Sequence, residues 1–280
     1  MKFILTFLLF ITSLLAYSQF WVGPKAGLTF THHIYDNPSF KNSYDISPDL
    51  NWHAGLSMDY DSEGRFVVHS ELTYERVGNR IRSTPGNPTI DAKSVYHFLS
   101  VPMMARVVFA GHRSSIKFYG SAGPRLKLWL GGNGLTIADE FIENGYDGRE
   151  YKVRFKNVSE RDDSNLQVGT EPDSDGRYIQ TGGEFIVEKA NRVQYSLDLG
   201  GGIFIDLQTG HRINVDARYS FGHSNMGFNV DGDGLNLADF DEDLEHHHNM
   251  LTVSVAFLWS YDPMAMKKGK STQGGRKAKN

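Results

Sequence analysis

An acidic segment in the C-terminal third of the chain has the spacing closest to a metal site. The run from Asn229 to Gly234 alternates oxygen-bearing side chains with other residues, and Asp239 and Asp241 follow it. Alternating oxygen ligands with a glycine at the sixth position wrap calcium in loops of the EF-hand type. If Asn229 is position one, position twelve is Phe240 rather than a carboxylate. The segment therefore predicts either a calcium site formed by Asn229, Asp231, Asp233, Asp239 and Asp241, or a solvated acidic loop.

Three consecutive histidines, His246 to His248, come directly after the acidic segment. Imidazoles beside carboxylates can hold zinc or act as a general base. Successive residues of a strand point to opposite faces, so the three rings cannot all face one ligand. We expect an ordinary polar start to a strand, with a metal or catalytic role as the alternative.

Other local catalytic motifs are missing from the sequence. It contains no serine-centred elbow, HExxH motif, P-loop or dinucleotide fingerprint. We therefore predict that the protein is not an enzyme and has no certain cofactor. An enzyme whose site forms among the external loops only on folding is the alternative.

The elements that would position these residues are predicted by period-two alternation. In residues 212–221 every second side chain from Ile213 to Phe221 is apolar, and those between are polar. One face suits lipid and the other a polar interior, as in the strands of a membrane barrel. The same reading gives eight strands, at 20–30, 51–60, 65–77, 96–109, 115–129, 193–207, 212–221 and 251–259.

The connections between these strands alternate between short and long. Tight-turn sequences lie at 61–64, 111–114 and 208–211, whereas the segments at 31–50, 78–95, 130–192 and 223–248 are long and polar. This predicts an all-β fold, an eight-stranded antiparallel outer-membrane β-barrel with short periplasmic turns, long extracellular loops and both termini periplasmic. A soluble barrel or β-sandwich is the alternative. Alternating stretches at 151–155 and 178–189 predict an extracellular hairpin inside the longest loop.

The amino-acid composition excludes several classes of protein. The chain has 280 residues, with 29 Lys+Arg, 33 Asp+Glu and no cysteine, and its mean hydropathy is -0.40. These values exclude a polytopic helical membrane protein, a disulfide-stapled module and a basic nucleic-acid binder. They allow a barrel, because a barrel strand needs only alternate apolar residues.

The two ends of the chain differ from the predicted barrel. Residues 1–18 combine Lys2, an apolar run and the sequence Ala16-Tyr17-Ser18, which is typical of a signal peptide cleaved before Gln19; an uncleaved anchor is the alternative. The barrel would span 19–262, with 263–280 as a disordered basic periplasmic tail. Its basic residues are candidates for binding a protein partner or lipid headgroups, with a solvated tail as the alternative: Lys267, Lys268, Lys270, Arg276, Lys277 and Lys279.

Charged residues also recur on the face predicted to line the barrel. The candidates are Lys25, Asp59, Glu71, Glu75, Arg106, Arg125, Lys127, Asp198, Asp216 and Arg218. Both signs are equally represented, and charges shielded from water are tolerated mainly when they are paired. We expect a network of ion pairs that closes the lumen, with a narrow polar conduit or ligand cavity as the alternative.

Five segments, in order along the chain, resemble the PorT-like outer-membrane β-barrel family. They are GPKAGLTF at 23–30, FLSVPMMAR at 98–106, YGSAGPR at 119–125, DLGGG at 198–202 and ARYSFG at 217–222. The resemblance implies an integral outer-membrane barrel and, from the founding member, a part in type IX secretion and gliding-associated export. The long segment at 130–192 and the basic tail depart from the family pattern.

From these features we expect a non-enzymatic scaffold or binding component, acting in protein export or a surface assembly. Its expected partners are outer-membrane lipid and a periplasmic or outer-membrane protein, but not nucleic acid. A narrow conduit for small solutes is a further alternative.

Overall fold

The computed structural model describes residues 19–61, 65–110, 114–139, 147–155, 167–168, 178–187, 190–227 and 243–261. Eight long strands form the wall: β1 (Gln19–Tyr35), β2 (Tyr44–Asp61), β3 (Phe66–Ser83), β4 (Ile90–Ala110), β5 (Ile116–Ala138), β9 (Val193–Asp206), β10 (His211–Gly222) and β11 (His246–Tyr261). Each pairs antiparallel with its neighbours in the order β4-β3-β2-β1-β11-β10-β9-β5, and β4 pairs with β5. The sheet therefore closes into a ring, and the predicted eight-stranded antiparallel barrel is confirmed.

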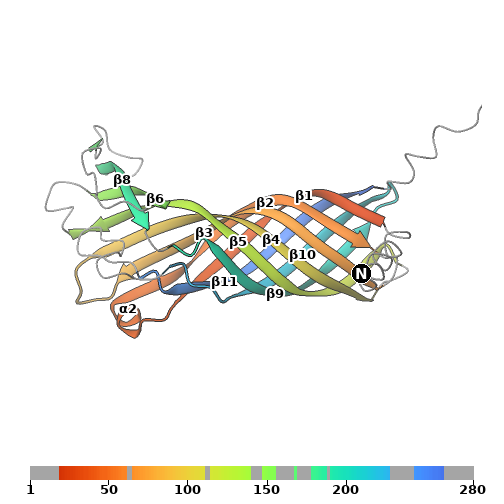
Figure 1. The fold of residues 1–280 in the computed structure, drawn as a ribbon, viewed down its shortest axis with the longest axis horizontal. Helices are drawn as coiled ribbons and strands as arrows, with labels where there is room; N and C mark the ends of the chain where they lie inside the picture. The colour runs from red at the N-terminus through yellow and green to blue at the C-terminus, as the bar shows by residue number, and fades with distance from the viewer. Residues whose placement is uncertain are drawn as a thin grey trace, which may run out of the picture.

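The two ends of the barrel differ in their connections (Figure 1). At one end, here called the turn end, β2 leads to β3, β4 to β5 and β9 to β10 across a few residues. Gly210 has a φ of 74° in the last of these turns, a conformation that glycine adopts without steric cost. The other end, the loop end, carries the helix α2 (Pro38–Ser43) and the strands β6 (Gly148–Phe155), β7 (Gln167–Val168) and β8 (Ile179–Val187).

Several strands run further toward the loop end than the sequence predicted. β1 pairs with β11 as far as Tyr35 opposite His246, and β3 pairs with β4 as far as Arg82 opposite Asp91. The segments 31–50 and 78–95 are therefore mostly strand. The segment 130–192 begins with the end of β5 and contains β6, β7 and β8, and the segment 223–248 ends with the start of β11. The prediction missed these extensions because polar residues occupy both faces, which hides the alternation although the backbone ladder continues.

The predicted hairpin within 130–192 is wrong in its pairing. β6 pairs antiparallel with β5, as a continuation of the wall, and β8 pairs parallel with β6. Parallel neighbours need a crossover connection rather than a tight turn. Local alternation locates such strands but does not determine which strands pair.

The wall separates two kinds of side chain. Outward-facing large apolar residues remain exposed along every wall strand, among them Leu28, Leu72, Met103, Leu128, Leu197, Phe221 and Val253. These residues form an outward apolar band between the turn end and the polar extensions at the loop end. The inward face carries the buried charged and hydroxyl side chains. Apolar-out and polar-in is the arrangement of a barrel whose solvent on the outside is lipid.

The interior is layered along the barrel axis. Near the turn end, inward aromatic residues such as Trp21 and Phe204 belong to two small apolar clusters. The charged residues lie in the middle. Nearer the loop end, an apolar plug fills the lumen, formed by Val77, Tyr96, Phe98, Trp129, Tyr151, Val153, Val187, Met226, Leu244 and Met250. A further cluster under α2 includes Tyr35 and Phe40.

Candidate functional site: the charged lumen

The ten charged residues predicted to line the lumen all lie inside the barrel. Their exposed fractions range from 0% to 3%. They come from seven different strands, β1, β2, β3, β4, β5, β9 and β10, and comprise five acids and five bases. Period-two geometry explains this convergence, because alternate residues of every wall strand point to one axis. We call this set the charge network.

Asp216 on β10 is the central acceptor of the charge network. Lys25 Nζ lies 2.9 Å from Asp216 Oδ2, and Arg218 Nε lies 2.9 Å from Asp216 Oδ1. Arg106 Nη2 is 3.7 Å from Asp216 Oδ2, and the Ser254 hydroxyl donates to Oδ1 at 2.9 Å. One carboxylate therefore faces three cations and one hydroxyl donor.

Glu71 on β3 is the second centre of the charge network. Lys25 Nζ lies 2.6 Å from Glu71 Oε1, and Arg218 forms an ion pair with the same carboxylate. The ring of His69, on the same strand, contacts Glu71 through Nε2 and Asp59 through Nδ1. Arg106 Nη1 in turn lies 2.9 Å from Asp59 Oδ1. The contacts join five strands, β1, β2, β3, β4 and β10, into one connected set.

A second group of pairs lies toward the loop end. Arg125 bridges two carboxylates, with Nη1 2.7 Å from Glu75 Oε1 and Nη2 2.7 Å from Asp198 Oδ2. The Ser220 hydroxyl donates to Asp198 Oδ1 at 2.6 Å. Lys127 Nζ contacts His248 Nε2 at 3.0 Å, and within the described chain no carboxylate oxygen lies within ion-pair distance of it. Lys127 thus marks the border between the charge network and the apolar plug.

The interior at the loop end holds a histidine cluster that the sequence analysis did not expect. His246 and His248 both face inward, and the ring centroid of His33 lies 5.0 Å from that of His246 and 5.7 Å from that of His248. These residues lie beyond the outward apolar band. Burial lowers the pKa of His33 well below its usual range, and it lowers the pKa of His246 to about 4 despite a hydrogen bond to the Asp243 carbonyl. The rings are therefore neutral at pH 7.

The prediction for the three histidines is correct in its geometry. His247 points away from the lumen, while its two neighbours are buried, as alternation on a strand requires. His33 was missed because it lies in a segment that was predicted to be a loop. Continuing the alternation of β1 through Thr31, His33 and Tyr35 would have found it.

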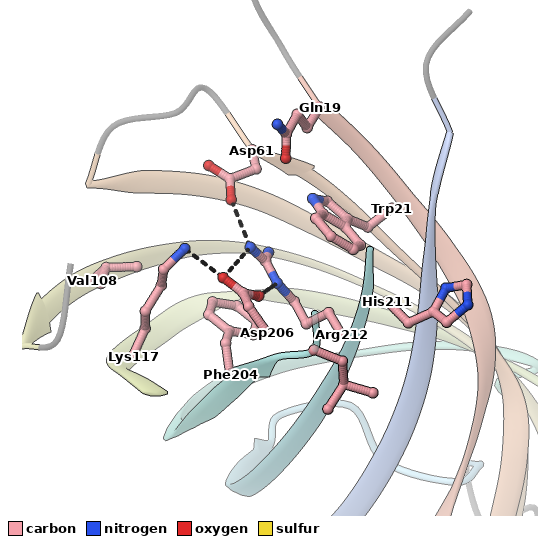
Figure 2. Close-up of a pocket in the computed structure, with 10 residues that line it drawn as sticks. Gln19, Trp21, Asp61, Val108, Lys117, Phe204, Asp206, His211 and Arg212 are labelled. Carbon is pink, nitrogen blue, oxygen red and sulfur yellow. Dashed lines mark hydrogen bonds and ion pairs between the residues drawn. The ribbon is translucent and has the colours of Figure 1, made fainter. Parts of the chain in front are cut away.

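A pocket opens at the turn end of the barrel, with a volume of about 390 Å³. Arg212 lies at its centre, with Nε 2.6 Å from Asp206 Oδ1 and Nη2 3.2 Å from Asp61 Oδ2. Lys117 Nζ is 2.7 Å from Asp206 Oδ2. Figure 2 shows the guanidinium of Arg212 between the two carboxylates. The guanidinium also packs over the Trp21 ring, 4.3 Å from the ring centroid. The charged residues of the pocket are therefore already paired with one another.

Three sequence predictions concern residues that the structure does not describe, wholly or in part. The candidate calcium ligands Asn229, Asp231, Asp233, Asp239 and Asp241 lie outside the described residues, and so does the basic tail from Lys267 to Lys279. The predicted signal peptide, 1–18, also lies outside them. Among the residues that are described, no group of three or more His, Asp or Glu side chains could hold a metal ion.

No helix in the described part of the chain is long and apolar enough to cross a membrane.

Comparison with known families gives one match, over residues 16–226, to the family described as outer membrane protein beta-barrel domain. The chain belongs to this family. An outer-membrane β-barrel protein has its apolar band in contact with lipid, which agrees with the apolar-out, polar-in wall. This places the protein in the outer membrane.

Solved structures of other outer-membrane barrels are similar at low identity. OprG of Pseudomonas aeruginosa is 10% identical, with 87% of this chain and 95% of that chain covered and a TM-score of 0.42. Neisserial surface protein A is 13% identical, with 85% and 95% covered and a TM-score of 0.34. The attachment invasion locus protein Ail of Yersinia pestis is 10% identical, with 85% and 98% covered and a TM-score of 0.34. A comparison with curated proteins gave no match.

Proposed function

We propose that this outer-membrane barrel is a non-enzymatic scaffold or binding component whose lumen is closed. The observation that carries the proposal is the burial of five acids and five bases in the middle of the lumen, nine of them in ion pairs with acids or bases from other strands. An eight-stranded barrel has an interior that side chains can fill, unlike barrels of 16 or more strands. The apolar plug adds a second closure toward the loop end.

Conduction of solutes would require the ion pairs to separate. Removing one partner of a buried ion pair costs about 3–5 kcal/mol, because the other charge stays buried without compensation. A path through the charge network would disturb several such pairs at once. We therefore place function on the surfaces that the rigid barrel presents, where sites are usually carried.

The proposed role within this class is PorT-like, in type IX protein secretion or a related surface assembly. It is supported by the resemblance of five ordered segments, of which DLGGG and ARYSFG lie on the adjacent strands β9 and β10. We further propose that both termini are periplasmic and that the basic tail, Lys267 to Lys279, contacts an acidic partner or anionic headgroups.

Planar-bilayer recordings test the closed lumen. We expect the purified barrel to give no long-lived conducting state at neutral pH. Regular openings of uniform conductance from the folded protein would contradict the proposal and favour the conduit.

Affinity capture from detergent-solubilised outer membranes tests the scaffold role. We expect the full chain to recover a partner in fixed ratio, and a chain truncated after Pro263 to lose it. Recovery of the barrel alone by both chains would contradict an assembly role.

Orientation can be tested because the native chain has no cysteine. Thr89→Cys places a thiol on an exposed loop-end turn, and Thr209→Cys places one on an exposed turn at the opposite end. We expect a membrane-impermeant maleimide to label only Thr89→Cys on intact cells. Labelling of Thr209→Cys alone would reverse the orientation.

A further inference from the structure

A groove of about 610 Å³ lies on the outer surface of the barrel where β4, β5 and β6 meet. Its floor is apolar, formed by Leu130, Val153 and Phe155, and its rim is polar, formed by His97, Asn133 and Lys152. The charge network and the turn-end pocket are elsewhere. Val153 belongs to the apolar plug and Phe155 packs against it, so the groove and the plug share these two residues. The binding of a ligand in the groove is not part of the proposed function.

The groove lies where β5 changes its pairing partner. β5 pairs with β9 up to Leu128 opposite Val193, and from Gly132 opposite Val153 it pairs with β6 instead. The β4–β5 register also shifts at this point, between His97 and Phe98. Gly131 has a φ of 148°, and a Cβ on Gly132 would lie 2.7 Å from the Val95 carbonyl oxygen. The backbone therefore favours residues without side chains at both positions.

At Leu130 the groove adjoins the surface that faces lipid. Leu126, Leu128 and Leu130 point outward in succession along β5, with exposed fractions of 49%, 37% and 44%. Leu130 is the last of this row, and Asn133 follows it as an exposed polar residue. The groove thus lies across the border between the outward apolar band and the polar extension. An apolar chain held there would be continuous with the surrounding bilayer.

The surroundings of the groove are cationic. Lys152 is exposed on the rim, and Arg192 packs over the Phe155 ring at 4.7 Å from its centroid. Arg76 pairs in register with His97, and its Nε is buried with no hydrogen-bond partner among the described residues. His97 is held by the Tyr74 hydroxyl at 2.7 Å. No acidic side chain of the described residues lines the groove.

We propose that this groove binds a net-anionic membrane lipid, with one acyl chain on the apolar floor and the headgroup phosphate at Lys152. The apolar floor complements the acyl chain of such a lipid, and the cationic rim complements its phosphate. A basic residue at a membrane surface contributes about 1 kcal/mol to the attraction of anionic lipid. Aromatic side chains near this border, such as Trp52 and Tyr74, are of the type that marks a membrane interface.

The test is lipid binding by the full barrel in detergent, measured by native mass spectrometry with phosphatidylglycerol and phosphatidylcholine as probes. We expect phosphatidylglycerol to bind in a ratio near one to one and more tightly than phosphatidylcholine. Lys152→Ala should weaken phosphatidylglycerol binding about fivefold. Lys93→Ala is the matched control, because Lys93 is also exposed on the outer wall but does not line the groove.

A second variant tests the space in the groove and leaves the charge of Lys152 in place. Asn133→Trp should fill the groove from its exposed rim and reduce binding of both lipids, while the barrel keeps its heat-dependent gel migration. Equal affinity for the two lipids, or equal losses in Lys152→Ala and Lys93→Ala, would overturn the proposal. Binding of inorganic phosphate alone as tightly as phosphatidylglycerol would also overturn the proposal, because the apolar floor would then contribute nothing.

Discussion

In the middle of the lumen ten charged side chains meet, whereas nearer the loop end the same wall strands carry Trp129, Phe98 and Tyr96. Along β5 the change takes two residues, from Lys127 to Trp129. Both regions are buried in one barrel and exclude solvent. In the charge network each residue depends on named partners, while in the apolar plug each contributes through packing that many neighbours share. Substitutions in the two regions should therefore change the free energy of unfolding by different amounts.

The largest effect is expected from Asp216→Ala in the charge network. The change leaves Lys25 and Arg218 without one of their carboxylates in a buried site. We expect the free energy of unfolding to fall by about 3–5 kcal/mol, measured by urea unfolding in detergent with tryptophan fluorescence. A loss below about 1 kcal/mol would mean that the network is solvated in the folded protein.

The next effect separates the histidine cluster from the charge network by its pH dependence. The folded pKa of His246 is about 4, below its usual 6.5, mainly because of burial. Charged groups on neighbouring elements act in both directions, since Asp243 and Asp36 raise the pKa and His247 lowers it. Between these pKa values the unfolded chain binds a proton that the folded chain does not. Titration of His246 should therefore lower stability as pH decreases from 6.5 to 4, by about 1.4 kcal/mol per unit at most. The buried His33 and His248 add further losses in the same direction.

His246→Asn should reduce the slope of this pH profile, because it removes one of the titrating rings. His247→Gln is the matched control, since His247 faces away from the lumen. If both variants keep the slope of the native chain, the buried ring is not the source of the dependence.

A smaller effect is expected in the apolar plug from Phe98→Leu. The ring stacks near Trp129, with centroids 6.3 Å apart, and leucine keeps most of the apolar volume. We expect a loss of about 1–1.5 kcal/mol by the same urea assay. A loss as large as that of Asp216→Ala would show that the apolar plug tolerates substitution no better than the charge network does.

The smallest effect is expected from Arg80→Ala, outside the lumen. Arg80 Nη2 lies 2.8 Å from Asp91 Oδ2, a distance similar to those of the buried pairs, but its side chain is 41% exposed. Exposed pairs contribute about 0–1 kcal/mol. Comparison of this variant with Asp216→Ala in one assay separates burial from distance as the origin of the effect.

The sequence alone was sufficient for the wall and for the facing of its side chains. The alternation in 212–221 correctly placed Asp216 and Arg218 inward, because strand geometry is local. It could not identify their partners, because Lys25, which pairs with Asp216, lies 191 positions away in the sequence. Nor could it supply the parallel pairing of β6 with β8 or the inward place of His33. Those depend on register and crossover, which are set by the closed ring rather than by any one segment.

The span of these pairs in sequence has a consequence for the order of assembly. Lys25 on the first wall strand meets Asp216, 191 residues later, so this pair cannot form until both ends of the chain are in place. A partly formed sheet would present several lone charges to the bilayer interior, where each is costly. Insertion and ring closure should therefore occur as one late, concerted event, with slow kinetics typical of long-range pairing. A nascent chain lacking its last two strands should accumulate at the membrane surface rather than inside it.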